Sequence, residues 1–146
     1  MTKPNFADMV IILAGYNNDM NNLLYVNEGL RSRFADEITF PSLNLEYCLQ
    51  LLSSKLKQSK ILAPALNNQK FHNLFDELSD LPGWGNARDV QTLAKSMVKA
   101  VYQNNTNGGQ LVLSEEVATA CIETMMAARR ARNQALPVSV SVLNWQ

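Results

Sequence analysis

Cysteine and histidine are scarce in this sequence: its 146 residues include 2 cysteines, Cys48 and Cys121, and 1 histidine, His72. Two cysteines far apart in the chain cannot form a disulfide framework, so their use indicates a reducing compartment. A single histidine with no neighbouring cysteine or second histidine argues against a zinc site. We therefore expect both cysteines to be small core residues, His72 to be structural, and the chain to contain no metal site.

Neither sign of charge is in excess, because 13 lysines and arginines balance 13 acidic residues and the formal net charge is +0. A nucleic-acid binder held by bulk positive charge is therefore disfavoured. No apolar run reaches the ~18 residues of a membrane span. The run at residues 9–14 lacks the cleavage site of a signal peptide. These features predict a soluble, intracellular protein that binds neither nucleic acid nor a membrane.

The sequence also contains no complete phosphate-binding motif. Such a loop needs Gly-x-x-x-x-Gly-Lys-Ser/Thr, because backbone N–H groups must surround the phosphates, and the 6 glycines are never spaced in this way. An acidic pair that holds magnesium should follow an apolar strand. Asp36 and Glu37 stand at the beginning of their predicted strand instead of after it, and Asp76 and Glu77 lie within a predicted helix. We interpret both pairs as solvated surface.

The first part of the chain has the pattern of the end of an α/β domain. Residues 9–14 are apolar without alternation, which is typical of a strand buried on both faces of a sheet. A short helix over residues 20–27 and a turn over 30–34 follow, and Pro41 ends a second short strand at 36–40. Such strands need partners, and an unpaired apolar strand predicts self-association.

The second part predicts four helices. A stripe of leucines follows the N-cap Asn44, and a second helix covers residues 69–81. The third helix begins after Asn86, and the fourth begins after Ser114 and ends near Arg132. We therefore predict a mainly helical chain with an α/β remnant at residues 1–41, a helical domain at 42–134 and an extended Val-Ser tail at 135–146.

Two groups of arginines are candidates for phosphate chemistry. Arg31 and Arg33 lie on a short turn that Leu30 and Phe34 would anchor. An arginine aimed at the γ-phosphate of a neighbouring subunit can stabilise charge during phosphoryl transfer. The alternative is a pair of surface arginines that bind the nearby carboxylates of residues 36 and 37.

Arg88 is expected in the first turn of the third predicted helix, after Gly85 and Asn86. A cation is unfavourable there, because the N-terminus of a helix is already positive. A bound anion such as phosphate would relieve this repulsion. The neighbouring carboxylate of Asp89 would do so too, and the sequence leaves both interpretations open.

Several of these motifs resemble one family. Three segments are similar to the second half of an AAA+ ATPase module. They are residues 10–20, with Leu-Ala-Gly-Tyr, residues 27–34, with Asn-Glu-Gly-Leu-Arg-Ser-Arg-Phe, and residues 85–90, with Gly-Asn-Ala-Arg-Asp-Val. The similarity is greatest to the CbxX/CfxQ, or stage V sporulation protein K-like, group. It covers roughly residues 9–132.

The resemblance implies a role for each motif. Residues 10–14 would be the sensor-1 strand, with Tyr16 and Asn17 in the sensor-1 region. Arg33 matches the arginine finger that acts on ATP of the adjacent subunit, and Arg31 lies beside it. Arg88 matches sensor 2 of the helical lid, which contacts the γ-phosphate of the subunit's own ATP.

The family's Walker A and Walker B motifs lie upstream of the region that this sequence matches. The resemblance therefore implies a C-terminal fragment of an AAA+ ATPase, inactive alone and without bound cofactor. The full-length protein would use ATP and Mg²⁺ in a homo-oligomeric, hexameric ring that remodels a protein partner. The alternative function is a non-catalytic helical module for protein interaction or oligomerisation. A weaker alternative is a helical nucleic-acid binder that uses Arg129, Arg130 and Arg132.

Overall fold

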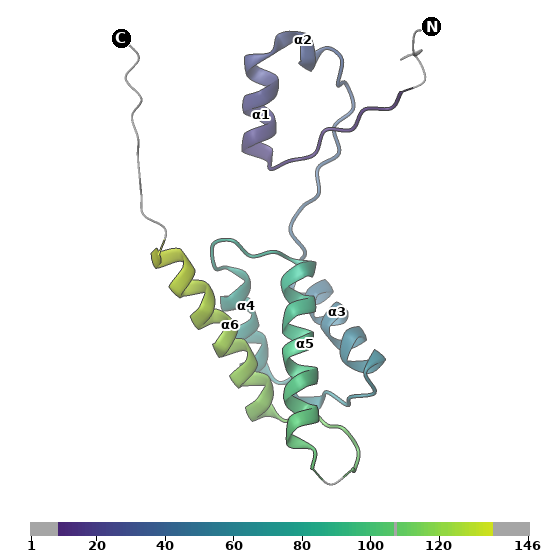
Figure 1. Cartoon of the computed structure of the whole chain (residues 1–146), viewed down its shortest axis with the longest axis vertical. Coiled ribbons are helices and arrows are strands. Elements are labelled where there is room, and N and C mark those ends of the chain that lie inside the picture. Colours follow the sequence, from purple (N-terminus) through teal and green to yellow (C-terminus); the bar gives the residue numbers. More distant parts are fainter. Residues whose placement is uncertain (1–8, 107, 136–146) are drawn as a thin grey trace, which may run out of the picture. The chain divides into compact units, whose positions relative to one another are not determined.

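The computed structural model describes residues 9–106 and 108–135, and the chain divides into two compact units between Phe40 and Pro41 (Figure 1). Each unit has its own local structure and is described separately. The predicted Val-Ser tail lies outside the described residues. Within the described part, no helix is both long and apolar enough to cross a membrane.

The first unit contains the helices α1 (Asn17–Val26) and α2 (Glu28–Arg31), which pack against each other. The strands predicted at residues 9–14 and 36–40 are not formed in this structure, where neither segment has regular secondary structure. A strand exists only where a neighbouring strand completes its hydrogen bonds, and no such neighbour is present in the described residues. Val10 and Ile12 are accordingly 84% and 82% exposed. The α/β remnant is therefore not formed as a sheet here.

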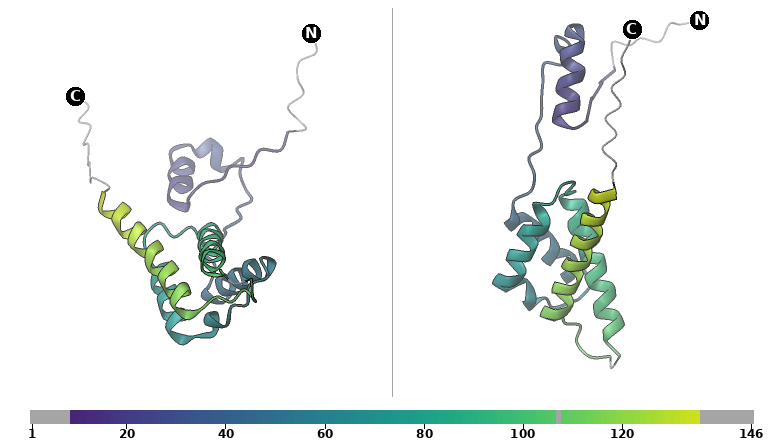
Figure 2. Two further views of the ribbon diagram at one scale, coloured as in Figure 1. Left: turned by 60° about the horizontal axis from the view of Figure 1, so that its bottom comes forward. Right: turned by 90° about the vertical axis from the view of Figure 1, so that its left-hand side faces the viewer.

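The second unit is the predicted helical bundle. It consists of the helices α3 (Leu45–Gln58), α4 (Gln69–Ser79), α5 (Ala87–Asn104) and α6 (Glu115–Ala135), with the short 3₁₀ helix η2 (Pro64–Asn67) between α3 and α4. Helix α5 packs against α3 and α6, and α4 packs against α6 and α3 (Figure 2). Each of the four long helices thus contacts two others around a common core. The prediction of a mainly helical chain is confirmed.

All the buried hydrophobic side chains of the described residues lie in this bundle. Helix α3 contributes Leu52 and Leu56 from the predicted stripe, which repeats with the period of a helix. The rings of Phe71 and Phe75 on α4 are 6.1 Å apart, and Phe75 meets the ring of Trp84 edge-on at 5.8 Å. Since apolar burial is the main stabilising force of a domain, the bundle holds most of the chain's stability.

Side-chain caps begin two of the helices where the sequence predicts them. The Asn44 side chain accepts a hydrogen bond of 2.9 Å from the Tyr47 N–H, and Ser114 Oγ accepts one of 3.3 Å from the Val117 N–H. Asn86 differs from its prediction. It occupies the N-cap position of α5 with φ 51°, but its side chain makes no cap and accepts instead from the Leu43 N–H at 2.8 Å. This bond ties the start of α5 to the start of α3.

Candidate functional site

The turn with Arg31 and Arg33 is held by backbone hydrogen bonds. The Leu30 N–H donates to the Asn27 carbonyl at 2.8 Å, and the Arg33 N–H donates to the Leu30 carbonyl at 2.9 Å. Leu30 and Phe34 are half-buried, and none of the described residues of this unit is fully buried, so the predicted anchoring of the turn in a core is not seen. Both arginine side chains are exposed. The turn therefore presents two cations from a short, locally stabilised segment.

The carboxylates of residues 36 and 37 do not neutralise these arginines. Only two ion pairs occur within residues 9–106 and 108–135, and both lie in the bundle. The predicted alternative, in which Arg31 and Arg33 bind Asp36 and Glu37, is therefore not observed. Neither guanidinium group is paired with a carboxylate among the described residues.

Tyr16 and Asn17 lie at the beginning of α1, away from the arginine turn. Tyr16 is the N-cap residue, is 84% exposed, and accepts a hydrogen bond from the Met20 N–H through its carbonyl at 2.9 Å. Asn17 is the first helical residue and is also exposed. Helix α1 has 10 residues, roughly 15 Å, so it separates these two residues from Arg31 and Arg33. The structure does not bring the two groups together.

Arg88 lies in the first turn of α5, as predicted, and it is exposed. Its carbonyl accepts a hydrogen bond of 3.0 Å from the Thr92 hydroxyl one turn later. Its guanidinium forms no ion pair with any described residue. Arg88 thus combines a cationic side chain with the positive end of an 18-residue helix, which is an arrangement that attracts anions.

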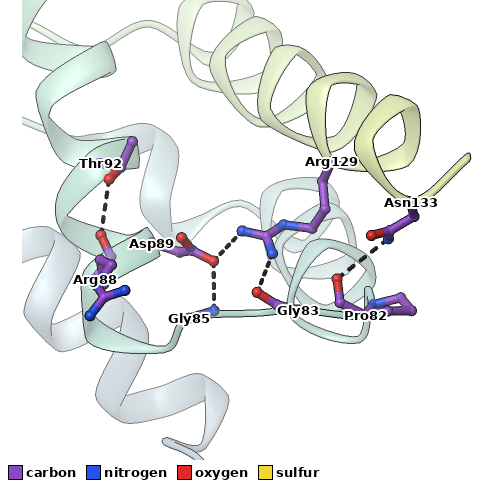
Figure 3. A network of polar contacts seen from close by, with 8 residues as sticks. All are labelled: Pro82, Gly83, Gly85, Arg88, Asp89, Thr92, Arg129 and Asn133. Atoms are coloured by element: carbon purple, nitrogen blue, oxygen red, sulfur yellow. Dashed lines mark hydrogen bonds and ion pairs between the residues drawn. The ribbon is translucent and has the colours of Figure 1, made fainter. Parts of the chain in front are cut away.

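Asp89 is not the partner of Arg88, although the sequence left that possibility open. Figure 3 shows the Asp89 carboxylate directed toward Arg129 of α6, with which it forms an ion pair, while Arg88 projects in another direction. The same carboxylate accepts from the Gly85 N–H at 2.6 Å. Arg129 also donates to the Gly83 carbonyl, and its guanidinium carbon lies 6.0 Å from the Trp84 ring. A network thus ties the loop before α5 to helix α6.

Glycine is required at position 83 within this network. Gly83 has φ +81°, a left-handed conformation that other residues adopt only with strain. A Cβ atom there would also lie 3.3 Å from Arg129 Nη1. The loop therefore depends on glycine both for its backbone and for the close approach of Arg129.

A groove of about 620 Å³ runs between α5 and α6. Arg88 and Arg132 line it, together with the paired Asp89 and Arg129. The polar side chains of Thr92 and Ser96 on α5 and the half-buried Cys121 of α6 complete this part of the lining. Because Arg88 begins α5 and Arg132 lies near the end of α6, both cations are at the same end of the groove. Phosphate or another small anion would meet positive charge at this end.

The remaining candidates have structural roles. Burial raises the pKa of the Cys48 and Cys121 thiols, which keeps both neutral at physiological pH. His72 Nε2 lies 2.6 Å from the Leu66 carbonyl and fixes η2 against α4. In the part of the chain that the structure describes, no group of three or more acidic, histidine or cysteine residues could hold a metal ion. The arginines therefore fit contacts to the phosphates of ATP, while the described residues supply no Mg²⁺ site.

Comparison with known proteins relates this sequence to one group of proteins. The Protein CfxQ homolog of Trieres chinensis is 26% identical over 111 residues, which is 75% of this chain and 38% of that protein. Protein CbxX of Cupriavidus necator is 25% identical over 126 residues, which is 86% of this chain and 40% of that protein. The chain is homologous to the CbxX/CfxQ group of AAA+ ATPases.

A shorter match has higher identity. The ESX-1 secretion system protein EccA1 of Mycolicibacterium smegmatis is 44% identical over 57 residues, which is 39% of this chain and 9% of that protein. No family model and no solved structure matches the chain. The chain thus spans about two fifths of the length of its CbxX/CfxQ relatives and a smaller share of EccA1.

The sequence did not reveal the role of Arg129 beside Asp89. The start of a helix is predicted locally by Asp89, at the third position of α5, and by the glycines before it. Arg129 is 40 residues away from Asp89, and no periodicity links them. Only the packing of α6 against α5 brings these two residues together.

Proposed function

We propose that this chain is the C-terminal part of an AAA+ ATPase module that couples ATP hydrolysis in a homo-oligomeric ring to the remodelling of a protein partner. Arg88 acts as sensor 2 on the subunit's own ATP, Arg33 with Arg31 beside it acts on ATP of the adjacent subunit, and Tyr16 and Asn17 belong to sensor 1. The position of Arg88 at the start of α5, without a carboxylate partner among the described residues, is the observation that carries this proposal.

The arginines bind and orient phosphate oxygens, since a guanidinium donates planar hydrogen bonds and remains charged at all physiological pH values. Bound ATP and Mg²⁺ would supply the phosphoryl group and its charge neutralisation. In this proposal the Mg²⁺ ligands and the phosphate-binding loop come from the part of the relatives that precedes the matched region. The 146 residues alone are then inactive toward ATP.

In the complete module, residues 9–14 and 36–40 pair with further strands of an α/β sheet. The apolar and β-branched composition of residues 9–14 supports this, because such a segment is stable only where both faces are covered. The exposed Val10 and Ile12 side chains then become buried. This pairing would place the sensor-1 residues at the carboxyl edge of the sheet, where ligands of α/β folds bind.

The nucleic-acid alternative loses most of its support. Arg129 is engaged by Asp89, and Arg130 is engaged by Glu77. Two of the three arginines invoked for that alternative are thus already paired with carboxylates, and the formal net charge is +0. Too little unpaired positive charge remains on α6 for binding held by phosphate contacts.

Titration of the chain with inorganic pyrophosphate at constant ionic strength tests the role of Arg88. The backbone amide signals at the start of α5 are followed by NMR. We expect saturable shifts in the wild type and a loss of affinity of about tenfold in Arg88→Gln, since charged hydrogen bonds contribute roughly 1.5–3 kcal/mol.

The matched control is Lys95→Gln, which removes the same charge from an exposed position of the same helix. This variant should bind as the wild type does. Equal affinity of the wild type and Arg88→Gln, or no saturable shift in the wild type, would reject the sensor-2 assignment and favour a non-catalytic interaction module.

A further inference from the structure

The carboxylate next to Arg88 lines the same groove as the proposed phosphate site and is paired there with one residue of another helix. Asp89 follows Arg88 directly, and the two side chains do not face each other, because adjacent residues of a helix do not lie on the same face. An unpaired carboxylate at this position would still weaken the positive potential around Arg88. The structure pairs that carboxylate with Arg129.

The Asp89–Arg129 pair is largely shielded from water. Its side chains are 15% and 14% exposed, whereas those of the neighbouring Arg130–Glu77 pair are 52% and 54% exposed. Screening by salt and water is weaker for a shielded pair, so its charges compensate each other more completely. The net positive charge around Arg88 then comes from Arg88 itself, from Arg132 at the same end of the groove and from the helix N-terminus.

Arg129 also fixes the loop from which α5 emerges. It donates to the Gly83 carbonyl, while Asp89 accepts from the Gly85 N–H, so both sides of Trp84 are attached to the pair (Figure 3). One turn later on α6, Asn133 donates to the Pro82 carbonyl at 3.4 Å. Helix α6 therefore fixes the position of the first turn of α5, and with it the position of Arg88.

We propose that Arg129 is a positioning residue for phosphate recognition by Arg88: it takes up the Asp89 carboxylate, so that this carboxylate neither repels an incoming phosphate nor offsets the charge of Arg88. The inference rests on the proposed function of Arg88 as a phosphate-binding residue. It assigns to Arg129 a role that acts through Asp89 and without contact to the ligand.

The test repeats the pyrophosphate titration at constant ionic strength with variants of this pair. Arg129→Gln leaves Asp89 uncompensated, and we expect its affinity for pyrophosphate to fall about fivefold, since an unpaired carboxylate then acts within ~10 Å of the ligand. The double variant Arg129→Gln/Asp89→Asn removes both charges. Its affinity should return to within about twofold of the wild type.

Arg130→Gln is the matched control. It removes the same side chain at the next position of α6 and breaks the exposed pair with Glu77. Its affinity for pyrophosphate should equal that of the wild type. Circular dichroism of every variant at the titration temperature establishes that the bundle is folded. If Arg129→Gln alone unfolds, the affinity of the double variant for pyrophosphate is the quantity that tests the proposal.

The outcomes separate this inference from the proposed function. If Arg88→Gln loses binding while Arg129→Gln binds as tightly as the wild type, the role of Arg129 is rejected and that of Arg88 stands. Failure of the double variant to recover binding likewise rejects the shielding role, because a structural loss is not restored by Asp89→Asn. If Arg88→Gln binds normally, the proposed function itself fails.

Discussion

Two consecutive arginines of α6 form ion pairs of very different character. Arg129 meets Asp89 in a shielded position where the same carboxylate also accepts from the Gly85 N–H. Arg130 meets Glu77 on the surface, where both side chains are more than half exposed. Shielded polar groups lose more than exposed ones when a partner is removed, because water replaces the lost interaction less completely.

At this scale we predict that Asp89→Ala lowers the free energy of unfolding by about 2 kcal/mol, since it leaves Arg129 and the Gly85 N–H without their acceptor. Glu77→Ala should cost less than about 1 kcal/mol, as is usual for an exposed pair. Urea denaturation of both variants measures the difference. Equal losses would contradict the structural distinction between the two pairs.

The residues of the candidate site were only partly predictable. The sequence placed Arg88 in the first turn of a helix and identified Asp89 as its possible neutralising partner, because both statements depend on local position. It could not choose between Asp89 and an anion, since the answer depends on Arg129, which lies 40 residues away from Asp89. The same holds for Asn86, whose side chain binds the Leu43 N–H in place of its own helix.

At the scale of single elements, the start of α6 joins a cap to a titratable group. Ser114 caps the helix, and Glu115 and Glu116 follow in its first turn. A hydrogen bond from its own backbone N–H, and then one from the Ser114 hydroxyl, hold the pKa of the Glu116 carboxyl below its usual value near 4.5. Because this pKa is lowered in the folded state, its stabilising effect is present above pH about 4.5 and is lost as the pH falls through the folded pKa.

We therefore predict that Ser114→Ala lowers the free energy of unfolding by about 1 kcal/mol at pH 7. The loss should shrink below the folded pKa of Glu116, because one hydrogen bond to the ionised carboxyl has then already gone. Denaturation at neutral and acidic pH measures both effects. The control is Ser53→Ala, an exposed interior position of α3 that should cost nothing; an equal cost at both positions would contradict the capping role.

The helices were predictable and the strands were not, for a physical reason. A helix forms its hydrogen bonds within one segment, so the leucine stripe of α3 and the breaks around Pro82 and Gly83 specify elements directly. A strand depends on a partner segment, which composition alone does not supply. Residues 9–14 have the composition of a buried strand and lack its pairing here.

For the whole molecule, the distribution of buried side chains separates the stability of the chain from its proposed activity. Every buried hydrophobic residue of the described part lies between Cys48 and Met126. The arginine turn and the residues proposed for sensor 1, Tyr16 and Asn17, lie outside this core. The bundle should therefore fold without the first unit.

A fragment of residues 41–135 should melt within about 3 °C of the complete chain, because it retains the whole core. Thermal unfolding followed by circular dichroism tests this. Leu93→Ala in the fragment, at a position with 0% exposure, should cost about 2–5 kcal/mol if the fragment has the same core. A fragment that is unfolded at 25 °C would contradict the assignment of stability to the bundle.

The apolar segment of the first unit predicts self-association at higher concentration. Val10 and Ile12 are more than four fifths exposed and β-branched, which favours pairing between strands of different molecules. Ile12→Lys should shift the complete chain toward the monomer in light scattering. Tyr102→Lys, at an exposed apolar position of α5, should leave association unchanged. A wild type that stays monomeric at all concentrations would contradict this prediction.

The most direct measurement of the central claim is ATP turnover by a fusion. The part of Cupriavidus necator CbxX that precedes the matched region is joined to the N-terminus of this chain. If this chain completes the ATP site, the fusion hydrolyses ATP with Mg²⁺, and Arg33→Ala retains ATP binding but loses roughly a thousandfold in turnover. Arg130→Ala should change neither ATP binding nor ATP turnover. An Arg33→Ala fusion that turns over ATP at the parent rate, or a parent fusion that binds ATP without hydrolysing it, would contradict the account.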